Sequence, residues 1–176
     1  MDYVVSACRF VIGAIFLVAV CGKALRPSAR AALAALVSGI AGTARPGPVV
    51  VAVICAEAGT VVLVAVPGTA RAGLVVAAAL LAMFAAAIGV GLRREVSVPC
   101  GCFGRAGAPL GAAHLLRNVL LTVIALTGTV AARPGVPAGS ELAGVALSLI
   151  AGAVLTLVFV FFDDIAALFA VSDPMR

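Results

Sequence analysis

The sequence predicts an all-α protein that lies in a membrane as a polytopic helix bundle. Of its 176 residues, 64% are hydrophobic and only 11% are charged, whereas an ordinary soluble domain carries about 25% charged residues. A soluble domain needs a polar coat around its core, while a chain solvated by lipid needs charge only in its loops and at its ends. The composition therefore excludes a soluble domain and predicts a single integral membrane domain over residues 1–176.

Five apolar windows are long enough to cross a membrane, because a spanning helix needs about 20 apolar residues. We expect spanning helices over residues 4–25, 49–66, 72–92, 112–132 and 142–162. Proline, glycine and arginine separate these windows, as expected of loops. Residues 28–43 also carry apolar side chains at helical spacing, but the run is short and flanked by arginines. It predicts an interfacial helix after the first span.

The charge balance points to lipid rather than to nucleic acid. Twelve basic and seven acidic residues give a net charge of +5. However, the longest basic run is Arg93-Arg94 and the only tyrosine is Tyr3. The chain therefore lacks the basic stripe and stacking rings of a nucleic-acid interface. We expect the lipid bilayer to be its main surrounding.

The most specific motif is Cys-x-Cys, formed by Cys100 and Cys102 in the expected loop between the third and fourth spans. Gly101 between them allows the sulfurs to meet, and a disulfide closed over so small a ring is strained. Strained disulfides are labile, so the motif favours thiol-disulfide exchange. Nearby arginines favour the thiolate form. The sequence thus predicts Cys100 and Cys102 as an exchanging, catalytic pair.

Two other interpretations of the motif stay open. The cysteines could be structural thiols in a non-enzymatic membrane subunit that anchors or matures a partner. Alternatively, Cys100, Cys102 and His114 could handle a metal such as copper, although a fourth ligand at standard spacing is missing. We expect no metal, and whether the protein is an enzyme stays open.

Polar residues inside the apolar windows predict a buried cluster. His114, Arg117 and Asn118 share one helix face at i, i+3 and i+4. Counting about 1.5 Å per residue from the nearest loops places Glu57 and Arg117 at matching depth, roughly 12 to 14 Å below one membrane surface. Because a lone charge at that depth is costly, we expect Glu57 to pair with Arg117, with Lys23 or His114 as a further partner.

The chain has five cysteines, so at least one thiol is left unpaired within the molecule. Cys21 and Cys55 come from the same half of the membrane as Cys100 and Cys102, and we expect them as further thiols of the site. Cys8 lies toward the other end of its window. It is expected to be a packing residue, as most buried cysteines are.

The membrane orientation is predicted differently by charge and by chemistry. The face that carries the cysteine loop holds eight of the basic residues that are counted by face, and by the positive-inside rule it would be cytoplasmic. Disulfides persist outside the cytoplasm. Six of those eight residues flank the interfacial helix or the cysteine loop, where they have local roles. We therefore expect the Cys100 loop on the outer face of the cell membrane.

The pattern resembles a known family. Cys100-Gly101-Cys102-Phe103-Gly104, Arg117-Asn118, and Gly13, Phe16 and Gly22-Lys23 resemble the methylamine utilisation protein MauE family, which is related to DoxX-like membrane proteins. The resemblance extends from the first to the fourth span. It implies a thiol-disulfide oxidoreductase or disulfide-maturation factor acting with a thioredoxin-like partner, classically on methylamine dehydrogenase.

The resemblance assigns the exchange to Cys100 and Cys102, and it places Lys23, Glu57, His114, Arg117 and Asn118 beside them as a supporting polar cluster. The architecture is also similar to vitamin K epoxide reductase homologues, which pass electrons from thiols to a quinone. A quinone-linked DoxX-like redox subunit is accordingly an alternative. The sequence itself makes no cofactor evident.

Overall fold

The computed structural model describes residues 2–94, 111–132, 142–162 and 165. Within these residues the chain is entirely helical between its turns. The elements, in chain order, are α1 (Asp2–Leu25), α2 (Pro27–Ala41), α3 (Gly47–Ala65), the 3-10 turn η1 (Pro67–Thr69), α4 (Ala70–Arg93), α5 (Ala112–Ala131) and α6 (Leu142–Val160).

The predicted membrane bundle is confirmed. Over the described residues, five helices are long and apolar enough to cross a membrane, and the shorter apolar helix α2 follows the first of them. Each of the six predicted segments begins and ends within two residues of the observed helix.

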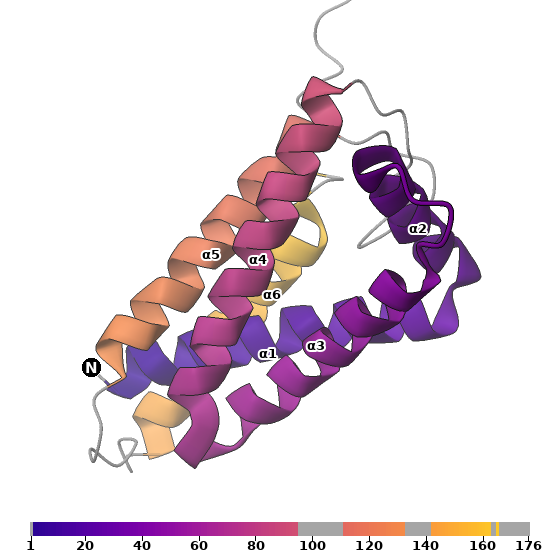
Figure 1. Ribbon diagram of the computed structural model, residues 1–176. Coiled ribbons are helices and arrows are strands. Elements are labelled where there is room, and N and C mark those ends of the chain that lie inside the picture. Colours follow the sequence, from indigo (N-terminus) through magenta and orange to yellow (C-terminus); the bar gives the residue numbers. More distant parts are fainter. Residues whose placement is uncertain (1, 95–110, 133–141, 163–164, 166–176) are drawn as a thin grey trace, which may run out of the picture.

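The bundle contains two helix pairs, α4 with α5 and α1 with α3, and the short helix α2 packs against three of these helices (Figure 1). α4 and α5 lie side by side along one side, and α1 packs against α3 along another. α1 also contacts α5 and α6, so it lies at the centre of the bundle, while α2 touches α1, α3 and α4. α6 packs on α1.

The short helix α2 is bounded by local chemistry. Arg26 is extended, as a residue before proline prefers, and Pro27 begins the helix at a position where no amide donor is needed. At the other end Gly42 adopts a left-handed conformation, with φ of 63°, and donates to the Ser38 carbonyl at 2.9 Å. This is a glycine cap, and it ends α2 well short of a membrane span.

At the end of the bundle where the chain begins, glycines let helices approach closely. A Cβ at Gly73 of α4 would lie 2.7 Å from the Val64 backbone nitrogen of α3. A Cβ at Gly128 of α5 would lie 2.8 Å from the Cys8 Cβ of α1. Such contacts are typical of helices that associate in lipid through small residues.

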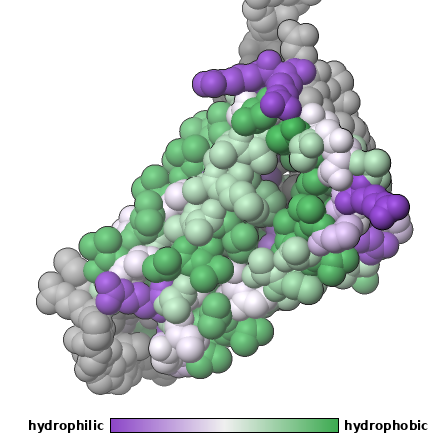
Figure 2. All heavy atoms as spheres, in the orientation of Figure 1, coloured by the Kyte–Doolittle hydropathy of each residue, from purple (hydrophilic) through white to green (hydrophobic). Residues whose placement is uncertain are grey.

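The outer surface is that of a protein solvated by hydrocarbon. Figure 2 shows one face, on which apolar residues cover the middle of the bundle and hydrophilic residues gather toward its ends. Many large apolar side chains are exposed, including Leu17, Val62, Val130 and Leu147. A soluble monomer would not expose them in such number.

Candidate functional site

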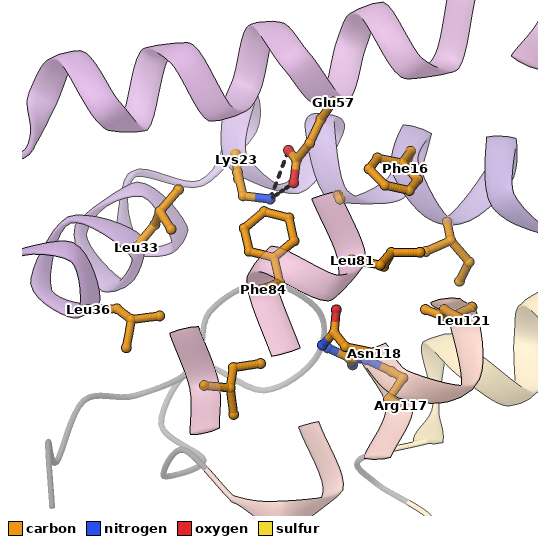
Figure 3. Close-up of a pocket in the computed structure, with 13 residues that line it drawn as sticks. Phe16, Lys23, Leu33, Leu36, Glu57, Leu81, Phe84, Arg117, Asn118 and Leu121 are labelled. Carbon is orange, nitrogen blue, oxygen red and sulfur yellow. Dashed lines mark hydrogen bonds and ion pairs between the residues drawn. The ribbon is translucent and has the colours of Figure 1, made fainter. Parts of the chain in front are cut away.

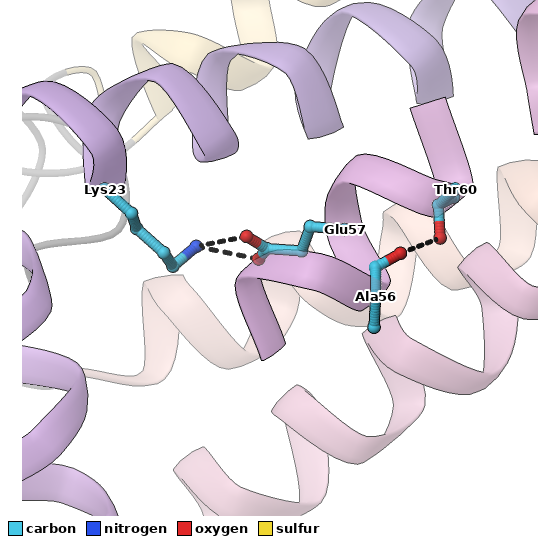
Figure 4. A network of polar contacts seen from close by, with 4 residues as sticks. All are labelled: Lys23, Ala56, Glu57 and Thr60. Carbon is cyan, nitrogen blue, oxygen red and sulfur yellow. Dashed lines mark hydrogen bonds and ion pairs between the residues drawn. The ribbon is translucent and has the colours of Figure 1, made fainter. Parts of the chain in front are cut away.

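A buried ion pair joins α1 and α3. The Nζ of Lys23 donates to both carboxylate oxygens of Glu57, at 2.7 and 2.9 Å, and each residue is only 1% exposed. Figure 4 shows the two side chains reaching toward each other, with the Thr60 hydroxyl turned back to the Ala56 carbonyl at 2.8 Å. Because Thr60 is satisfied within its own helix, Lys23 is the partner that compensates the Glu57 charge.

The partner of Glu57 corrects the sequence-based pairing. We expected Arg117 as the main partner and Lys23 as an additional one; among the described residues the ion pair of Glu57 is with Lys23. α1 packs directly on α3, whereas α5 packs on α4 and α1. Depth counted from the loops correctly placed Arg117 near the level of Glu57, since both line one cavity. It could not show which helices are in contact.

Both ends of the pair point inward because each occupies the buried stripe of its helix. On α1 this stripe is Ile12, Ile15, Phe16, Ala19 and Lys23, and on α3 it is Val50, Val53, Glu57, Thr60 and Val64. These spacings follow the helical repeat. The charged residues thus take positions where an apolar residue would otherwise pack.

α5 contributes the other polar side chains of the expected cluster. His114, Arg117 and Asn118 are 4%, 2% and 7% exposed. Asn118 donates from Nδ2 to the His114 carbonyl at 2.8 Å. The same face continues with Leu121, Ala125 and Gly128, so α5 is polar on its inner face at its first turns and apolar beyond them. The prediction that Glu57 and Arg117 both lie inside the bundle is confirmed.

Lys23, Glu57, Arg117 and Asn118 line one cavity of about 40 Å³. Figure 3 shows Arg117 and Asn118 across the cavity from the ion pair, with the Phe84 ring beside Lys23. The Lys23 Nζ lies 5.9 Å from the centre of that ring. The rest of the lining is apolar and comes from α1, α2, α4 and α5. We call this space the polar cavity.

Three charged side chains line the polar cavity, Lys23, Glu57 and Arg117, and Lys23 and Glu57 neutralise each other. The volume is enough for about three water molecules. A quinone ring does not fit as the cavity stands, since an aromatic ring of benzene size needs about 150 Å³. The described geometry therefore suits water and small polar groups.

His114 lies one turn before Asn118 and is buried, but it is not among the residues that line the cavity. Of the five polar residues expected together, the structure thus brings four to one space. His114 stays adjacent to that space through its carbonyl, which accepts from Asn118.

Sequence reasoning missed three arginines that bind helix ends. Arg30 donates to the Lys23 and Ala24 carbonyls at the end of α1, both at 3.0 Å. Arg94 donates to the Ile40 carbonyl near the end of α2 at 2.7 Å. Arg9 donates to the last carbonyls of α3. A cation at a helix C-terminus is favourable, but only tertiary structure shows which helix it reaches.

The cysteines separate into three groups. Cys8 is buried against Gly128, which confirms it as a packing residue. Cys21 and Cys55 are free and exposed, and they do not line the polar cavity. Their role as further thiols stays a prediction. Cys100 and Cys102 lie outside the described residues, between the end of α4 and the start of α5.

A metal centre receives no support from the part of the chain that the structure describes. No three His, Cys, Asp or Glu side chains come together there as ligands. The alternative site of Cys100, Cys102 and His114 falls partly outside those residues.

Two aromatic residues line the polar cavity, Phe16 and Phe84. Phe16 belongs to the sequence pattern that resembles the family, whereas Phe84 is one apolar residue in an apolar helix and carried no sequence signal. The position of Phe84 beside Lys23 follows from helix packing alone.

Comparison with protein-family models gives one match. Comparisons with curated proteins and with solved structures gave none. The model of the methylamine utilisation protein MauE family matches residues 1–131, which include α1 to α5 and the polar cavity. α6 follows the matched region. The match covers four of the five spans and the predicted motif residues, and on this match the chain belongs to the MauE family.

Proposed function

We propose that the protein is a membrane thiol-disulfide oxidoreductase that exchanges electrons with a thioredoxin-like protein through Cys100 and Cys102. The family name supports a place in methylamine utilisation, where disulfides of methylamine dehydrogenase are the expected final target. The observation that carries the proposal is the polar cavity. It is built from α4 and α5, the two helices that the cysteine segment connects, together with α1, α2 and α3.

A buried polar site at this position is costly to keep for stability alone. Replacing a buried ion pair with well-packed apolar residues is often neutral or stabilising. Intramembrane charges are accordingly functional candidates. The polar cavity lies between helices that include α4 and α5, which the cysteine segment connects, and basic side chains near a thiol favour the thiolate required for exchange.

The exchange balances between two pairs of thiols. A thiolate of the partner attacks the Cys100-Cys102 disulfide, forms a mixed disulfide and releases one cysteine of the pair as a thiolate. The second partner thiol then attacks the mixed disulfide and releases the other cysteine. The partner loses two electrons, and Cys100 and Cys102 gain them with two protons. The reverse sequence reduces the partner.

Trapping tests this proposal. Cys100→Ser and Cys102→Ser are each combined with an oxidised thioredoxin-fold protein, whose disulfide the remaining motif thiolate attacks. The reaction is stopped with acid, free thiols are alkylated, and mixed disulfides are read on non-reducing gels. We expect one of the two variants to accumulate the mixed disulfide, because its resolving thiol is missing, and the double variant to form none.

Cys8→Ala is the matched control, since Cys8 is a buried packing residue, and it should leave trapping unchanged. Cys21→Ser and Cys55→Ser test whether the two exposed thiols take part in the exchange. If neither single variant of the motif traps a partner while all variants remain folded, the exchange function is wrong. The protein would then be a non-enzymatic anchor or assembly subunit, which is the alternative.

The quinone-linked alternative is not favoured by the polar cavity. Its donors would suit a carbonyl oxygen, but its volume is too small for the ring. We therefore derive no step through a quinone.

We further propose that the Cys100 segment faces the outside of the cell. Arg30 and Arg94 bind helix carbonyls, and Lys23 is neutralised by Glu57. The basic excess of this face thus partly reflects structural contacts rather than topology. In intact cells, a membrane-impermeant thiol reagent should label Cys100 and Cys102 after mild reduction. Labelling only after permeabilisation would place the segment in the cytoplasm and give the exchange a reductive role.

A further inference from the structure

A second hollow lies at the opposite end of α1 from the polar cavity. It measures about 510 Å³. Its floor is α1, from Ser6 to Leu17, and its walls are the end of α3 and the first half of α6. Both walls pack on α1. We call this hollow the outer groove, because it lies on the outer, lipid-facing surface of the bundle; the name does not refer to the outer face of the membrane.

The outer groove is apolar along most of its length and opens to the bilayer. Phe10, Leu17 and Leu149 line it and are 37%, 51% and 42% exposed. From Arg9 to Leu17 the floor runs about 12 Å along α1. Its volume is more than ten times that of the polar cavity, which is enough for a flexible chain.

One cation stands at the end of this groove. Arg9 lines it and donates from Nε to the Val64 carbonyl and from Nη2 to the Ala65 carbonyl, both at 3.0 Å. The two carbonyl oxygens carry only partial negative charges, so they do not neutralise the Arg9 guanidinium. Among the residues that the structure describes, Arg9 has no acidic partner within ion-pair distance.

The guanidinium also lies at the right level for a lipid headgroup. α3 has 19 residues and is about 28 Å long, close to the hydrocarbon thickness of a bilayer. Because Arg9 binds the last carbonyls of α3, its charge lies at one edge of the hydrocarbon, next to the lipid phosphates.

We propose that the outer groove is a binding site for an anionic phospholipid. One acyl chain lies along Phe10, Ala14 and Leu17 between α3 and α6, and the phosphate pairs with Arg9. Charge complementarity selects this occupant over a neighbouring transmembrane helix, because a lipid supplies an apolar chain and an anion in one molecule.

Lipid retention tests the site. The full chain is purified in mild detergent, exchanged into an equimolar mixture of phosphatidylglycerol and phosphatidylcholine, and stripped by repeated washing. The lipid that stays bound is counted by native mass spectrometry. We expect phosphatidylglycerol to be retained over phosphatidylcholine. We expect Arg9→Gln to lower that preference about fivefold, the value of one cation near a bilayer surface.

Two further variants separate the site from folding. Ala14→Phe fills the floor of the groove without touching the cation, and it should also release the lipid. Arg71→Gln removes an exposed cation at the start of α4 and should leave retention unchanged. Equal retention of both lipids by the unaltered chain would overturn the proposal. So would unchanged retention in folded Ala14→Phe, or a second copy of the chain crosslinked through Leu17 and Leu149 in place of lipid.

Discussion

The two ends of the bundle are built on opposite principles. Near the start of α1, helices approach closely at glycines: Gly73 meets the backbone at the end of α3, and Gly128 meets the Cys8 side chain. Near the end of α1, an ion pair and a helix too short to span keep the helices apart around a cavity. The first arrangement maximises packing, while the second retains polar groups that packing alone does not need. The contrast supports the proposal that the thiol-exchange site is at the second end.

The largest expected effect comes from breaking the ion pair. Glu57→Leu leaves the Lys23 ammonium buried without its partner and should lower the free energy of unfolding by about 3 to 5 kcal/mol. The double variant Lys23→Met with Glu57→Leu should restore stability to within about 1 kcal/mol of the unaltered protein. Reversible unfolding in mixed micelles measures both.

The same double variant separates structure from function. If the pair serves the exchange reaction, the stable double variant should still oxidise or reduce a thioredoxin-fold protein more slowly, by tenfold or more. A double variant with full stability and an unchanged exchange rate would show that the pair is only structural.

The next largest effect is expected at the end of the bundle near the start of α1, where glycines let the helices approach closely. Gly73→Ala places a methyl group 2.7 Å from the Val64 nitrogen and 2.8 Å from the Leu63 carbonyl carbon, where only backbone can move. We expect a loss of about 1 to 3 kcal/mol. Gly59→Ala is the control, because its Cβ would meet nothing within 4 Å. It should stabilise α3 by up to about 1 kcal/mol. Equal effects of the two substitutions would remove the contrast between the ends.

A smaller effect is expected at the arginine that ties α2 to α4. Arg94→Gln removes the 2.7 Å bond to the Ile40 carbonyl, and it should cost less than about 1 kcal/mol because the bond is exposed. Amide hydrogen exchange should rise near the end of α2 and stay unchanged in α5. Arg93→Gln, one residue earlier, is the control. If both variants leave α2 equally protected, the contact does not hold the helix.

The sequence was sufficient to predict the helices but not their contacts. Spans follow from the length and composition of apolar windows, so their limits came within two residues of the observed ones. The cost of a lone charge in lipid also predicted that Glu57 and Arg117 face inward. It named Lys23 only as a further partner of Glu57, because the direct pairing depends on α1 lying against α3. The sequence could not indicate Phe84 or the arginine contacts, which connect residues far apart in the chain.

The central proposal is thiol-disulfide exchange by Cys100 and Cys102. Family membership connects it to methylamine utilisation, and the polar cavity supports it. The most direct test uses the variant Cys8→Ala, Cys21→Ser, Cys55→Ser, in which only these two thiols remain. Reconstituted in lipid, it is mixed with a thioredoxin-fold protein, and transfer of the disulfide is followed by alkylation and mass. We predict transfer at the rate of the unaltered protein, and its complete loss when Cys100→Ser is added. Loss of transfer in the triple variant alone, or transfer that survives Cys100→Ser, would contradict the assignment.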